Sequence, residues 1–374
     1  MYQRIIKKSI EKRLFQGKVI ILYGPRRVGK TTLVKEILDE FKGEKLYIAC
    51  DIPSRRELVS VPEPTILKQN FGNAKLVIID EAQLIENIGV ILKVFVDTYP
   101  EIQIIATGSS SFDLANKIRE PLTGRAYEYM LYPLSCEEIS LNDNFAQSDQ
   151  EQFRMRFGWY PGMPLDIHEA TNYLEILQQN TFYKDILTFE NIKKPKILQD
   201  LLIQLAFRIG SVITIQSLAN EIKTTAKTIE RYIDILEKMF VITRLYAYSR
   251  NPSNERKKGL KIYFTDIGLR NSLIKDHKEL RFRNDIGALF ENYFIMERIK
   301  YLANHETYVN KYFWQNYRQE EVDYLEESNG KIEAYECKFT ERKSKSLIIF
   351  QNEYKDSTTH IVSKNNYIKY IINT

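Results

Sequence analysis

The stretch that most constrains the fold joins a strand pattern, a short loop and a helical pattern within residues 18–41. The apolar run Val19–Tyr23 leads into a loop bounded by Gly24 and Gly29, and a helical pattern follows. The spacing Gly-x4-Gly-Lys-Thr is that of a phosphate-binding loop. Its glycines allow backbone angles that other residues avoid, so the chain can approach a ligand closely. Loop N–H groups and the free donors of the helix then face an anion, which predicts a phosphate site.

Two side chains complete this predicted site. Lys30 supplies a positive charge for the β and γ phosphates of a nucleotide, and Thr31 supplies a hydroxyl for Mg²⁺. A chance glycine loop is the alternative, and the full spacing between a strand and a helix argues against it. The sequence therefore predicts ATP and Mg²⁺ as ligands. The predicted nucleotide-binding residues of the loop are Gly24, Pro25, Arg26, Arg27, Val28, Gly29, Lys30, Thr31 and Thr32.

Composition limits the class of protein. A chain of 374 residues predicts two or three domains, and 44% apolar with 28% charged residues is typical of a soluble globular protein. No apolar run is long enough for a membrane span, and the N-terminus lacks an apolar signal core. The cysteines Cys50, Cys136 and Cys337 fit no zinc or disulfide spacing, which favours a cytoplasmic location. A net charge of +5 permits nucleic-acid binding without requiring it.

Strand and helix patterns alternate over residues 1–135, which predicts a parallel α/β sheet. Three more strands are expected at Lys45–Cys50, Lys75–Ile79 and Ile102–Thr107. Asp80 and Glu81 follow the third strand of the chain, at the carboxyl edge where ligands bind in such sheets. We expect Asp80 to hold Mg²⁺ through water and Glu81 to activate the attacking water. A helix cap and first turn is the alternative role for this acidic pair.

Two later polar positions extend the predicted site. The fourth strand is followed by serines, of which Ser109 or Ser110 is expected to contact the γ-phosphate or the attacking water. Capping of a helix at Phe112–Ile118 is the alternative. Arg125 has the side chain suited to a developing phosphoryl charge, in its own subunit or in a neighbour. An ordinary salt bridge is the alternative role of Arg125.

These motifs occur in a specific order: Gly-Pro-Arg-Arg-Val-Gly-Lys-Thr-Thr, Ile-Ile-Asp-Glu-Ala-Gln, Thr-Gly-Ser-Ser, Leu-Thr-Gly-Arg and Tyr-Pro-Leu-Ser. The chain thereby resembles prokaryotic AAA+-like P-loop ATPases that carry a C-terminal DUF4143 domain. The resemblance implies ATP hydrolysis and a helical lid over residues 136–192. Within that range, Asn142–Gln152 is polar and predicts a surface loop, and Ala170–Leu187 predicts a helix. The cellular role of the family is poorly defined.

Residues 193–275 predict a winged-helix-like region. After a helix at Ile197–Phe207, a short helix at Ile215–Ile222, a polar turn and a longer helix at Ala226–Met239 form a helix-turn-helix pattern. The alternating segment Val241–Tyr248 is the expected wing. If the region binds DNA, the groove-facing candidates on the longer helix are Lys227, Thr228 and Arg231.

A packing or partner module is the alternative for this region. Glu230, Asp234 and Glu237 share the longer helix and would repel phosphates. The basic loop at residues 250–261 is a second candidate for phosphate contacts, although charge runs are usually solvated.

The C-terminal region carries a second informative stretch, in which two alternating runs flank Asn329-Gly330. With those two residues as the turn, Ser328 pairs with Lys331 and the paired residue numbers sum to 659. The same register places Asp323 opposite Glu336, and Glu321 opposite Lys338. All four then share one face, and the opposite, core face carries Val322, Tyr324, Tyr335 and Cys337.

Opposed carboxylates repel, and a divalent cation between Asp323 and Glu336 would remove that repulsion. Lys338 could then position or deprotonate water. This Asp…Glu-x-Lys arrangement resembles metal-dependent nucleases of the restriction-endonuclease, PD-(D/E)xK-like fold, and the resemblance adds Glu291 to a site for Mg²⁺ or Mn²⁺. Asp323 follows Val322 rather than proline, so the motif is incomplete. A solvated hairpin face is the alternative. A strand at Tyr308–Trp314, a helix at Ser344–Tyr354 and a strand at Thr359–Val362 complete the expected domain.

Together these patterns predict an α/β chain with a P-loop core at 1–135, a lid at 136–192, a winged-helix-like region at 193–275 and a nuclease-like domain at 276–374. The expected function is ATP hydrolysis that controls a nucleic-acid-processing domain, with DNA favoured over RNA. The alternative is a nucleotide-dependent switch that docks a protein partner. A third hypothesis is a motor that translocates on DNA, which would require a homo-oligomeric ring and ATP hydrolysis stimulated by DNA.

Overall fold

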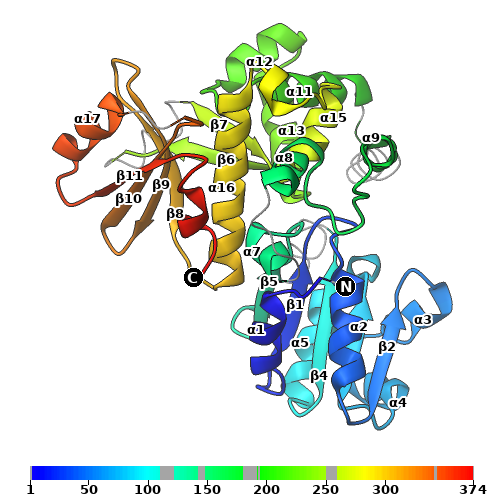
Figure 1. Ribbon diagram of the computed structural model, residues 1–374. Helices are drawn as coiled ribbons and strands as arrows, with labels where there is room; N and C mark the ends of the chain where they lie inside the picture. Colours follow the sequence, from blue (N-terminus) through cyan, green and yellow to red (C-terminus); the bar gives the residue numbers. More distant parts are fainter. Residues whose placement is uncertain are drawn as a thin grey trace. The chain divides into compact units, whose positions relative to one another are not determined.

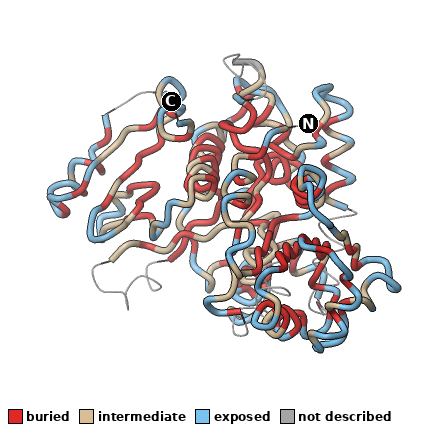
Figure 2. Tube along the Cα trace, turned by 90° about the horizontal axis from the view of Figure 1, so that it is seen from below, coloured by how far each residue is buried: buried red, intermediate tan, exposed pale blue. Residues whose placement is uncertain are grey.

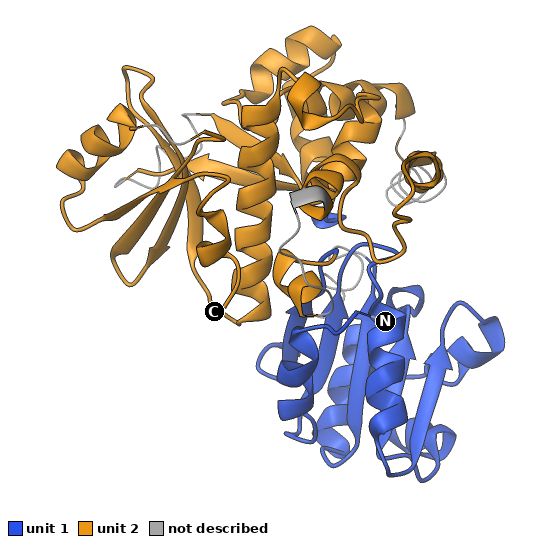
Figure 3. Ribbon diagram, viewed as in Figure 1, with its two compact units in different colours: residues 1–133, 238–240 blue, residues 134–237, 241–374 orange. Residues whose placement is uncertain are grey.

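A computed structural model describes residues 2–109, 122–141, 148–179, 192, 194–249, 259–340 and 343–373. Several predicted features lie outside these ranges: Ser110, the helix at 112–118, the loop at 142–147, residues 180–187 of the helix expected to end at Leu187, and residues 250–258 of the basic loop. The chain forms two compact units, residues 1–133 with 238–240 and residues 134–237 with 241–374 (Figure 3). Within the described ranges, no helix combines the length and apolar character needed to cross a bilayer.

The first unit is built on a five-stranded parallel sheet in the order β2-β3-β4-β1-β5 (Figure 1). The four predicted strands are confirmed to within one residue at each end. The fifth strand was not predicted, because it is an edge strand whose residues are mostly only half-buried. The strands are β1 (Val19–Tyr23), β2 (Lys45–Ala49), β3 (Leu76–Asp80), β4 (Gln103–Gly108) and β5 (Ala126–Met130).

The central strands are buried on both faces, as expected for a parallel sheet (Figure 2). Val19, Ile21 and Tyr23 join one core cluster with Phe71 of α4 and Phe95 of α5, whose rings meet edge to face at 5.0 Å. Alternation along β1 sends the intervening side chains to the other face. The helices of this unit are α1 (Ile6–Lys12), α2 (Lys30–Glu40), α3 (Pro53–Glu57), α4 (Pro64–Phe71) and α5 (Ile88–Thr98), with a 3₁₀ turn at η1 (Ala82–Leu84).

The second unit contains a six-stranded mixed sheet in the order β11-β10-β9-β8-β6-β7. Helix α16 (Ile286–Asn304) packs on one face, and α17 (Lys345–Glu353) packs on the other face (Figure 1). The strands are β6 (Ile242–Ala247), β7 (Leu260–Phe264), β8 (Asn310–Gln315), β9 (Glu321–Ser328), β10 (Lys331–Cys337) and β11 (Thr358–Val362). Strands from both sides of the predicted boundary at residues 275 and 276 therefore share one sheet. The strand that we expected to be a wing is β6, which pairs with β7 and β8.

The helices of the second unit follow the predicted helix-turn-helix order, with α11 (Pro195–Phe207), α12 (Ile215–Ile222) and α13 (Ala226–Lys238). The predicted loop at Asn142–Gln152 is partly wrong, because α8 begins at Ser148. Its sequence is too polar to show a clear apolar stripe. The other described helices are α7 (Cys136–Ser140), α8 (Ser148–Phe157), α9 (Ile167–Ile176) and α15 (Ile267–Leu273), with 3₁₀ turns η4 (Leu280–Phe282) and η5 (Tyr367–Tyr370).

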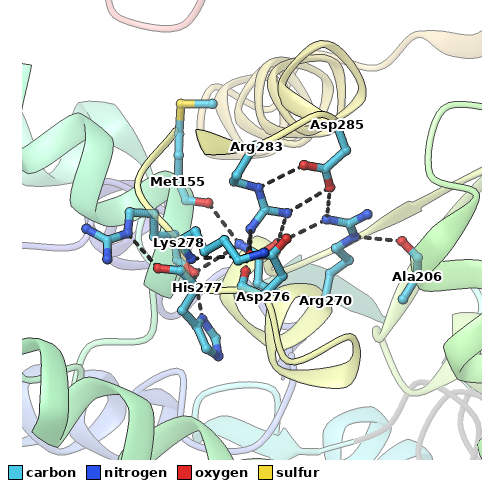
Figure 4. Close-up of polar contacts among 10 residues, drawn as sticks. Met155, Ala206, Arg270, Asp276, His277, Lys278, Arg283 and Asp285 are labelled. Carbon is cyan, nitrogen blue, oxygen red and sulfur yellow. Dashed lines mark hydrogen bonds and ion pairs between the residues drawn. The ribbon is translucent and has the colours of Figure 1, made fainter. Parts of the chain in front are cut away.

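A buried polar network ties α15 to its neighbours across the predicted boundary (Figure 4). Arg270 donates to the carbonyl of Ala206 in α11 (2.7 Å) and to Asp285 before α16 (2.6 Å). Arg283 donates to both oxygens of Asp285, at 2.8 and 2.7 Å, and to Asn271 at 3.1 Å. Burial alone would raise the pKa of Asp285, but the two guanidinium groups outweigh it and lower the pKa to about 2. This network therefore helps to make residues on both sides of position 275 one folding unit.

Candidate functional site

The phosphate loop has the backbone shape that its glycines predicted. A Cβ on Gly24 would lie 2.2 Å from the carbonyl oxygen of Leu131, so no side chain fits there. Gly29 has a φ of 96° and forms the N-cap of α2. Between them, Pro25 and Val28 are buried, whereas Arg26 and Arg27 are exposed, as is Thr32 in the first turn of α2.

Lys30 is buried at the start of α2, with 5% of its surface exposed. Its ammonium donates to the carbonyl oxygens of Gly24 and Pro25, each at 2.8 Å. Burial lowers its pKa to about 8, against the opposing effect of the Glu81 and Asp80 charges. The ammonium is therefore held by the same loop that is expected to bind the phosphates.

Asp80 is the polar centre of the carboxyl edge. Its carboxylate accepts hydrogen bonds from the hydroxyls of Thr31 (2.8 Å), Tyr47 (2.5 Å) and Thr107. Strands β2 and β4 flank β3, so the acidic residue is held from both neighbouring strands. The sequence analysis missed Tyr47 and Thr107, and only the strand order brings them beside Asp80.

Glu81 follows Asp80 and has a left-handed backbone with a φ of 56°. Its N–H donates to the hydroxyl of Thr107 at 3.1 Å, which fixes this unusual turn. The amide of Gln83 donates to the Glu81 carboxylate and, at 3.2 Å, to the hydroxyl of Ser109. The structure thus brings Ser109 into the same hydrogen-bonded group as Glu81.

Arg4 is a third residue that sequence reasoning missed. It is buried, and its guanidinium donates to the carbonyls of Val28 in the phosphate loop and Tyr132 beyond β5, each at 2.7 Å. A single arginine near the N-terminus gives no motif, so only the fold reveals this anchor.

Arg125 lies away from the predicted site in its own chain. Its carbonyl accepts from the N–H of Val19, which begins β1, whereas the phosphate loop follows Tyr23 at the other end. Four strand residues at about 3.3 Å each separate the two edges by about 13 Å. The side chain forms an exposed ion pair with Asp97 at 2.6 Å. The expectation that Arg125 acts on the nucleotide of its own subunit is therefore corrected.

The predicted C-terminal hairpin register is confirmed. Ser328 pairs with Lys331, and the ladder continues to Tyr324 and Tyr335, with every paired sum equal to 659. The turn residues Asn329 and Gly330 both have positive φ, 53° and 78°, as a two-residue hairpin turn requires.

Beyond that ladder the predicted alternation fails. On β8, Tyr312 and Trp314 are two residues apart, but their partners on β9, Leu325 and Val322, are three apart. This extra residue is a β-bulge, which reverses the alternation of side chains. Val322 and Leu325 consequently enter the same core cluster with Phe350 of α17.

The bulge sends Val322 and Tyr324, which were expected on one core face, to opposite faces of the sheet. Tyr324 contacts Tyr335, and Tyr335 contacts Phe294 of α16, with ring centroids 5.9 Å apart in both pairs. The prediction that Val322 and Tyr324 share a face is therefore wrong. Asp323 and Glu336 do not appear as a ladder pair, and neither do Glu321 and Lys338. Instead the N–H of Cys337 donates to the Asp323 carboxylate at 2.8 Å.

The predicted acidic residues do gather, but around an ammonium group. Lys261 of β7 is fully buried, and its Nζ lies 2.5 Å from Glu321, 3.0 Å from Glu291 and 3.2 Å from Asp323. We name these four residues the Lys261 cluster. Burial alone would lower the pKa of Lys261, but the neighbouring Glu291, Tyr263, Asp323 and Glu321 raise it well above its usual range. The sequence analysis placed Lys261 at the end of a basic loop expected to contact phosphates, and this placement is wrong, because Lys261 lies in β7 and is buried.

Glu336 and Lys338 form an ion pair of 2.7 Å next to this cluster. Burial and the negative charge of Asp323 raise the pKa of Glu336, and burial and Asp323 likewise raise the pKa of Glu291. Oε2 of Glu336 is buried and has no hydrogen-bond partner among the described residues. The expected second divalent cation does not fit the cluster as it stands, because the carboxylate oxygens facing Lys261 already accept from its ammonium. No group of three or more His, Cys, Asp or Glu in the described ranges is arranged to hold a metal ion.

On α13, the helix expected to face DNA, Lys227 and Arg231 are exposed and Thr228 is half-buried. Two of its acidic residues pair with Arg244 of β6, which lies 2.7 Å from Asp234 and also contacts Glu237. The expected repulsion of phosphates from this helix is therefore reduced.

Comparison with family models divides the chain into three parts. Residues 16–140 match an AAA domain, residues 149–280 match a domain of unknown function (DUF8612), and residues 286–373 match a domain of unknown function (DUF4143). The chain contains an AAA domain and a DUF4143 domain. The AAA-like domain and the DUF4143 domain expected from the motifs are thereby confirmed.

The similar curated proteins are themselves uncharacterized. One from Mycobacterium tuberculosis is 25% identical over 90% of this chain and 73% of its own length. One from Methanocaldococcus jannaschii is 27% identical over 86% of this chain and 75% of its own length. One from Haemophilus influenzae is 22% identical over 98% of this chain and 93% of its own length.

Two solved structures show weak likeness. Drosophila ORC bound to AT-rich DNA and Cdc6 has a TM-score of 0.27 at 12% identity, covering 73% of this chain and 91% of that chain. A STAND ATPase with a tetratricopeptide repeat sensor from Pyrococcus horikoshii has a TM-score of 0.23 at 11% identity. The match covers 80% of this chain and 46% of that chain. Scores this low bear on neither fold nor function.

Proposed function

We propose that the AAA domain binds ATP with Mg²⁺ and hydrolyses it, and that this nucleotide cycle controls the C-terminal domain. The contact between Thr31 and Asp80 carries the proposal. It brings a hydroxyl at the start of α2 within 2.8 Å of the carboxylate that ends β3, and these two groups are suited to hold Mg²⁺. When bound, Mg²⁺ would neutralise charge on the phosphates.

The chain's own residues then have distinct tasks. The loop N–H groups and Lys30 bind the phosphates, and Glu81 accepts a proton from the attacking water. Gln83 orients the Glu81 carboxylate and links it to Ser109, to which we assign contact with the γ-phosphate. We base these roles on the charges of Lys30 and Glu81 and on the hydrogen bonds of Gln83, all at the carboxyl edge of the sheet.

The test of this proposal is ATP hydrolysis with two variants and a control. Glu81→Gln keeps the shape but removes the base, so it should bind ATP normally and hydrolyse it at least about 100-fold more slowly. Lys30→Ala should lose ATP binding. Glu86→Gln, an exposed change nearby, should behave as wild type. Wild-type hydrolysis by Glu81→Gln would refute the assignment.

Two candidate functions of the C-terminal domain are each supported by an observation. Nucleic-acid cleavage is supported by the gathering of Glu291, Asp323, Glu336 and Lys338 in a PD-(D/E)xK-like order. The alternative, a domain that docks a partner and does not cleave, is supported in its second part by Lys261, whose ammonium makes the contacts that a divalent cation would need for cleavage.

Cleavage of plasmid and single-stranded DNA with Mg²⁺ or Mn²⁺ separates these two functions. We would compare wild type, Lys30→Ala, and Asp323→Ala combined with Lys338→Ala, each with and without ATP. Cutting that is lost in the double variant would establish a nuclease, and the response of Lys30→Ala would show whether ATP controls it. No cutting with ATP hydrolysis intact would favour docking.

A role for Arg125 would require a homo-oligomer, because it lies at the far edge of the sheet in its own chain. We propose it as a residue acting on a neighbouring subunit. A chain that stays monomeric with ATP, with unchanged hydrolysis by Arg125→Ala, would refute this role.

A further inference from the structure

We propose that the Lys261 ammonium takes the place of a divalent cation, so that the carboxylate cluster of the C-terminal domain is complete without a metal ion. The Lys261 cluster is separate from the residues proposed to bind and hydrolyse ATP.

The hydrogen-bond geometry of Lys261 supports this assignment. A lysine ammonium has three donors, and Nζ has three carboxylate neighbours, Glu291, Glu321 and Asp323, at 2.5 to 3.2 Å. The carboxylates come from α16 and β9, and the ammonium comes from β7. One cation thus joins three separate elements, which is the structural task of a metal ion in such a cluster.

The neighbours of the cluster fix the same arrangement. Tyr263 donates to the Glu291 oxygen that faces Lys261, at 2.6 Å, and Cys337 donates its N–H to the second oxygen of Asp323. Gly210 packs against Glu291 so closely that an added Cβ would lie 2.9 Å from its Oε1. The carboxylates are therefore held by protein donors and have little room to reorient.

The two cations would also compete for the same carboxylate oxygens, because those that face the cluster centre already accept from Lys261. Lys261 is fully buried, and the side chains of Glu291, Glu321 and Asp323 are 13%, 27% and 10% exposed, so water screens their charges only in part. Removal of the ammonium would leave three largely buried carboxylates with Lys338 as their remaining positive neighbour, which is destabilising. A divalent cation at the same centre would face the ammonium at close range, and the two positive charges would repel.

The decisive variant is Lys261→Met in the full chain, which removes the charge and keeps the apolar stem. Wild type should show no change in melting temperature when Mn²⁺ replaces KCl at equal ionic strength without nucleotide. Lys261→Met should melt lower than wild type and recover several degrees with Mn²⁺. Adding Asp323→Asn to Lys261→Met should abolish that recovery.

Lys300→Met is the matched control. Lys300 is also a buried lysine, and it pairs with Glu297 at 2.6 Å on α16. Its loss should destabilise the chain without creating a response to Mn²⁺. A folded Lys261→Met that gains nothing from Mn²⁺ would overturn the proposal.

A measurement on wild type decides the question even if Lys261→Met does not fold. Electron paramagnetic resonance counts the Mn²⁺ bound by wild type and by Asp323→Asn, both without nucleotide. Equal binding supports the internal ammonium. A bound ion present in wild type and missing from Asp323→Asn overturns it. ATP hydrolysis measured on the same samples reports separately on the AAA domain.

Discussion

Removal of one hydroxyl group, in Tyr47→Phe, should disturb the magnesium site without changing its charge. The Tyr47 hydroxyl donates at 2.5 Å to the same Asp80 oxygen that accepts from Thr31 at 2.8 Å. Burial and this bond to Asp80 raise the pKa of Tyr47, so the hydroxyl stays protonated as a donor. In the variant, Asp80 keeps its contacts with Thr31 and Thr107 but loses its support from β2.

The size of the effect follows from the environment of that bond. A hydrogen bond to a charged group contributes ~1.5–3 kcal/mol, and Tyr47 is only half-buried, so water can replace part of it. We therefore take the lower end, ~1.5 kcal/mol, as the loss in free energy of unfolding. If the same energy orients Asp80, the Mg²⁺ concentration for half-maximal ATP hydrolysis should rise roughly tenfold.

The assay is ATP hydrolysis as a function of free Mg²⁺ at saturating ATP, with urea unfolding of the same samples. Tyr127→Phe is the control, since that hydroxyl bonds only the exposed Gln16, at 2.9 Å, among the contacts described. It should leave the Mg²⁺ requirement unchanged. An unchanged or lowered Mg²⁺ requirement in Tyr47→Phe would refute the reasoning, as would an equal rise in Tyr127→Phe.

Two other substitutions test buried contacts, that of Arg4 with the phosphate loop and that of His277 with Phe157. Arg4→Ala should weaken ATP binding by roughly tenfold, because the phosphate loop loses its anchor at Val28, and fluorescent ATP titration would measure this. Arg4→Lys should recover part of the affinity. Burial lowers the pKa of His277, which stacks on Phe157 at 5.3 Å, so the unfolded chain binds a proton more readily. Stability should therefore be complete above the unfolded pKa near 6.5 and fall as the pH drops below it. Urea unfolding at pH 7.5 and 5.5 should show a smaller loss in His277→Gln, and an equal loss would contradict this assignment.

Local patterns were sufficient for the phosphate loop and for the hairpin turn. The loop spacing has a backbone requirement that few sequences meet, and Gly24 shows it in the 2.2 Å approach of Leu131. The turn at Asn329 fixed the hairpin register because both central residues must adopt positive φ. The bulge could not be predicted from β9 alone, since it arises from the pairing of β9 with β8.

The residues that sequence reasoning missed share a physical cause. Tyr47 and Thr107 reach Asp80 because β2 and β4 flank β3, and that order is a property of the whole sheet. Arg4 likewise reaches Val28 from 24 residues away. None of these residues carries a motif, because a hydrogen bond to a functional group can be made from many positions in a chain.

Lys261 shows how such a contact can change the chemistry of a motif. Glu291, Asp323, Glu336 and Lys338 can all be found from sequence, and taken alone they indicate a metal site. One buried ammonium on a separate strand supplies the positive charge that their clustering demands. A carboxylate motif therefore predicts that a cation is needed, and the fold determines whether that cation is a metal ion or a lysine. For this domain the distinction separates metal-dependent cleavage from metal-free docking, which is why the Mn²⁺ response of Lys261→Met is the more informative experiment than loss of any single carboxylate.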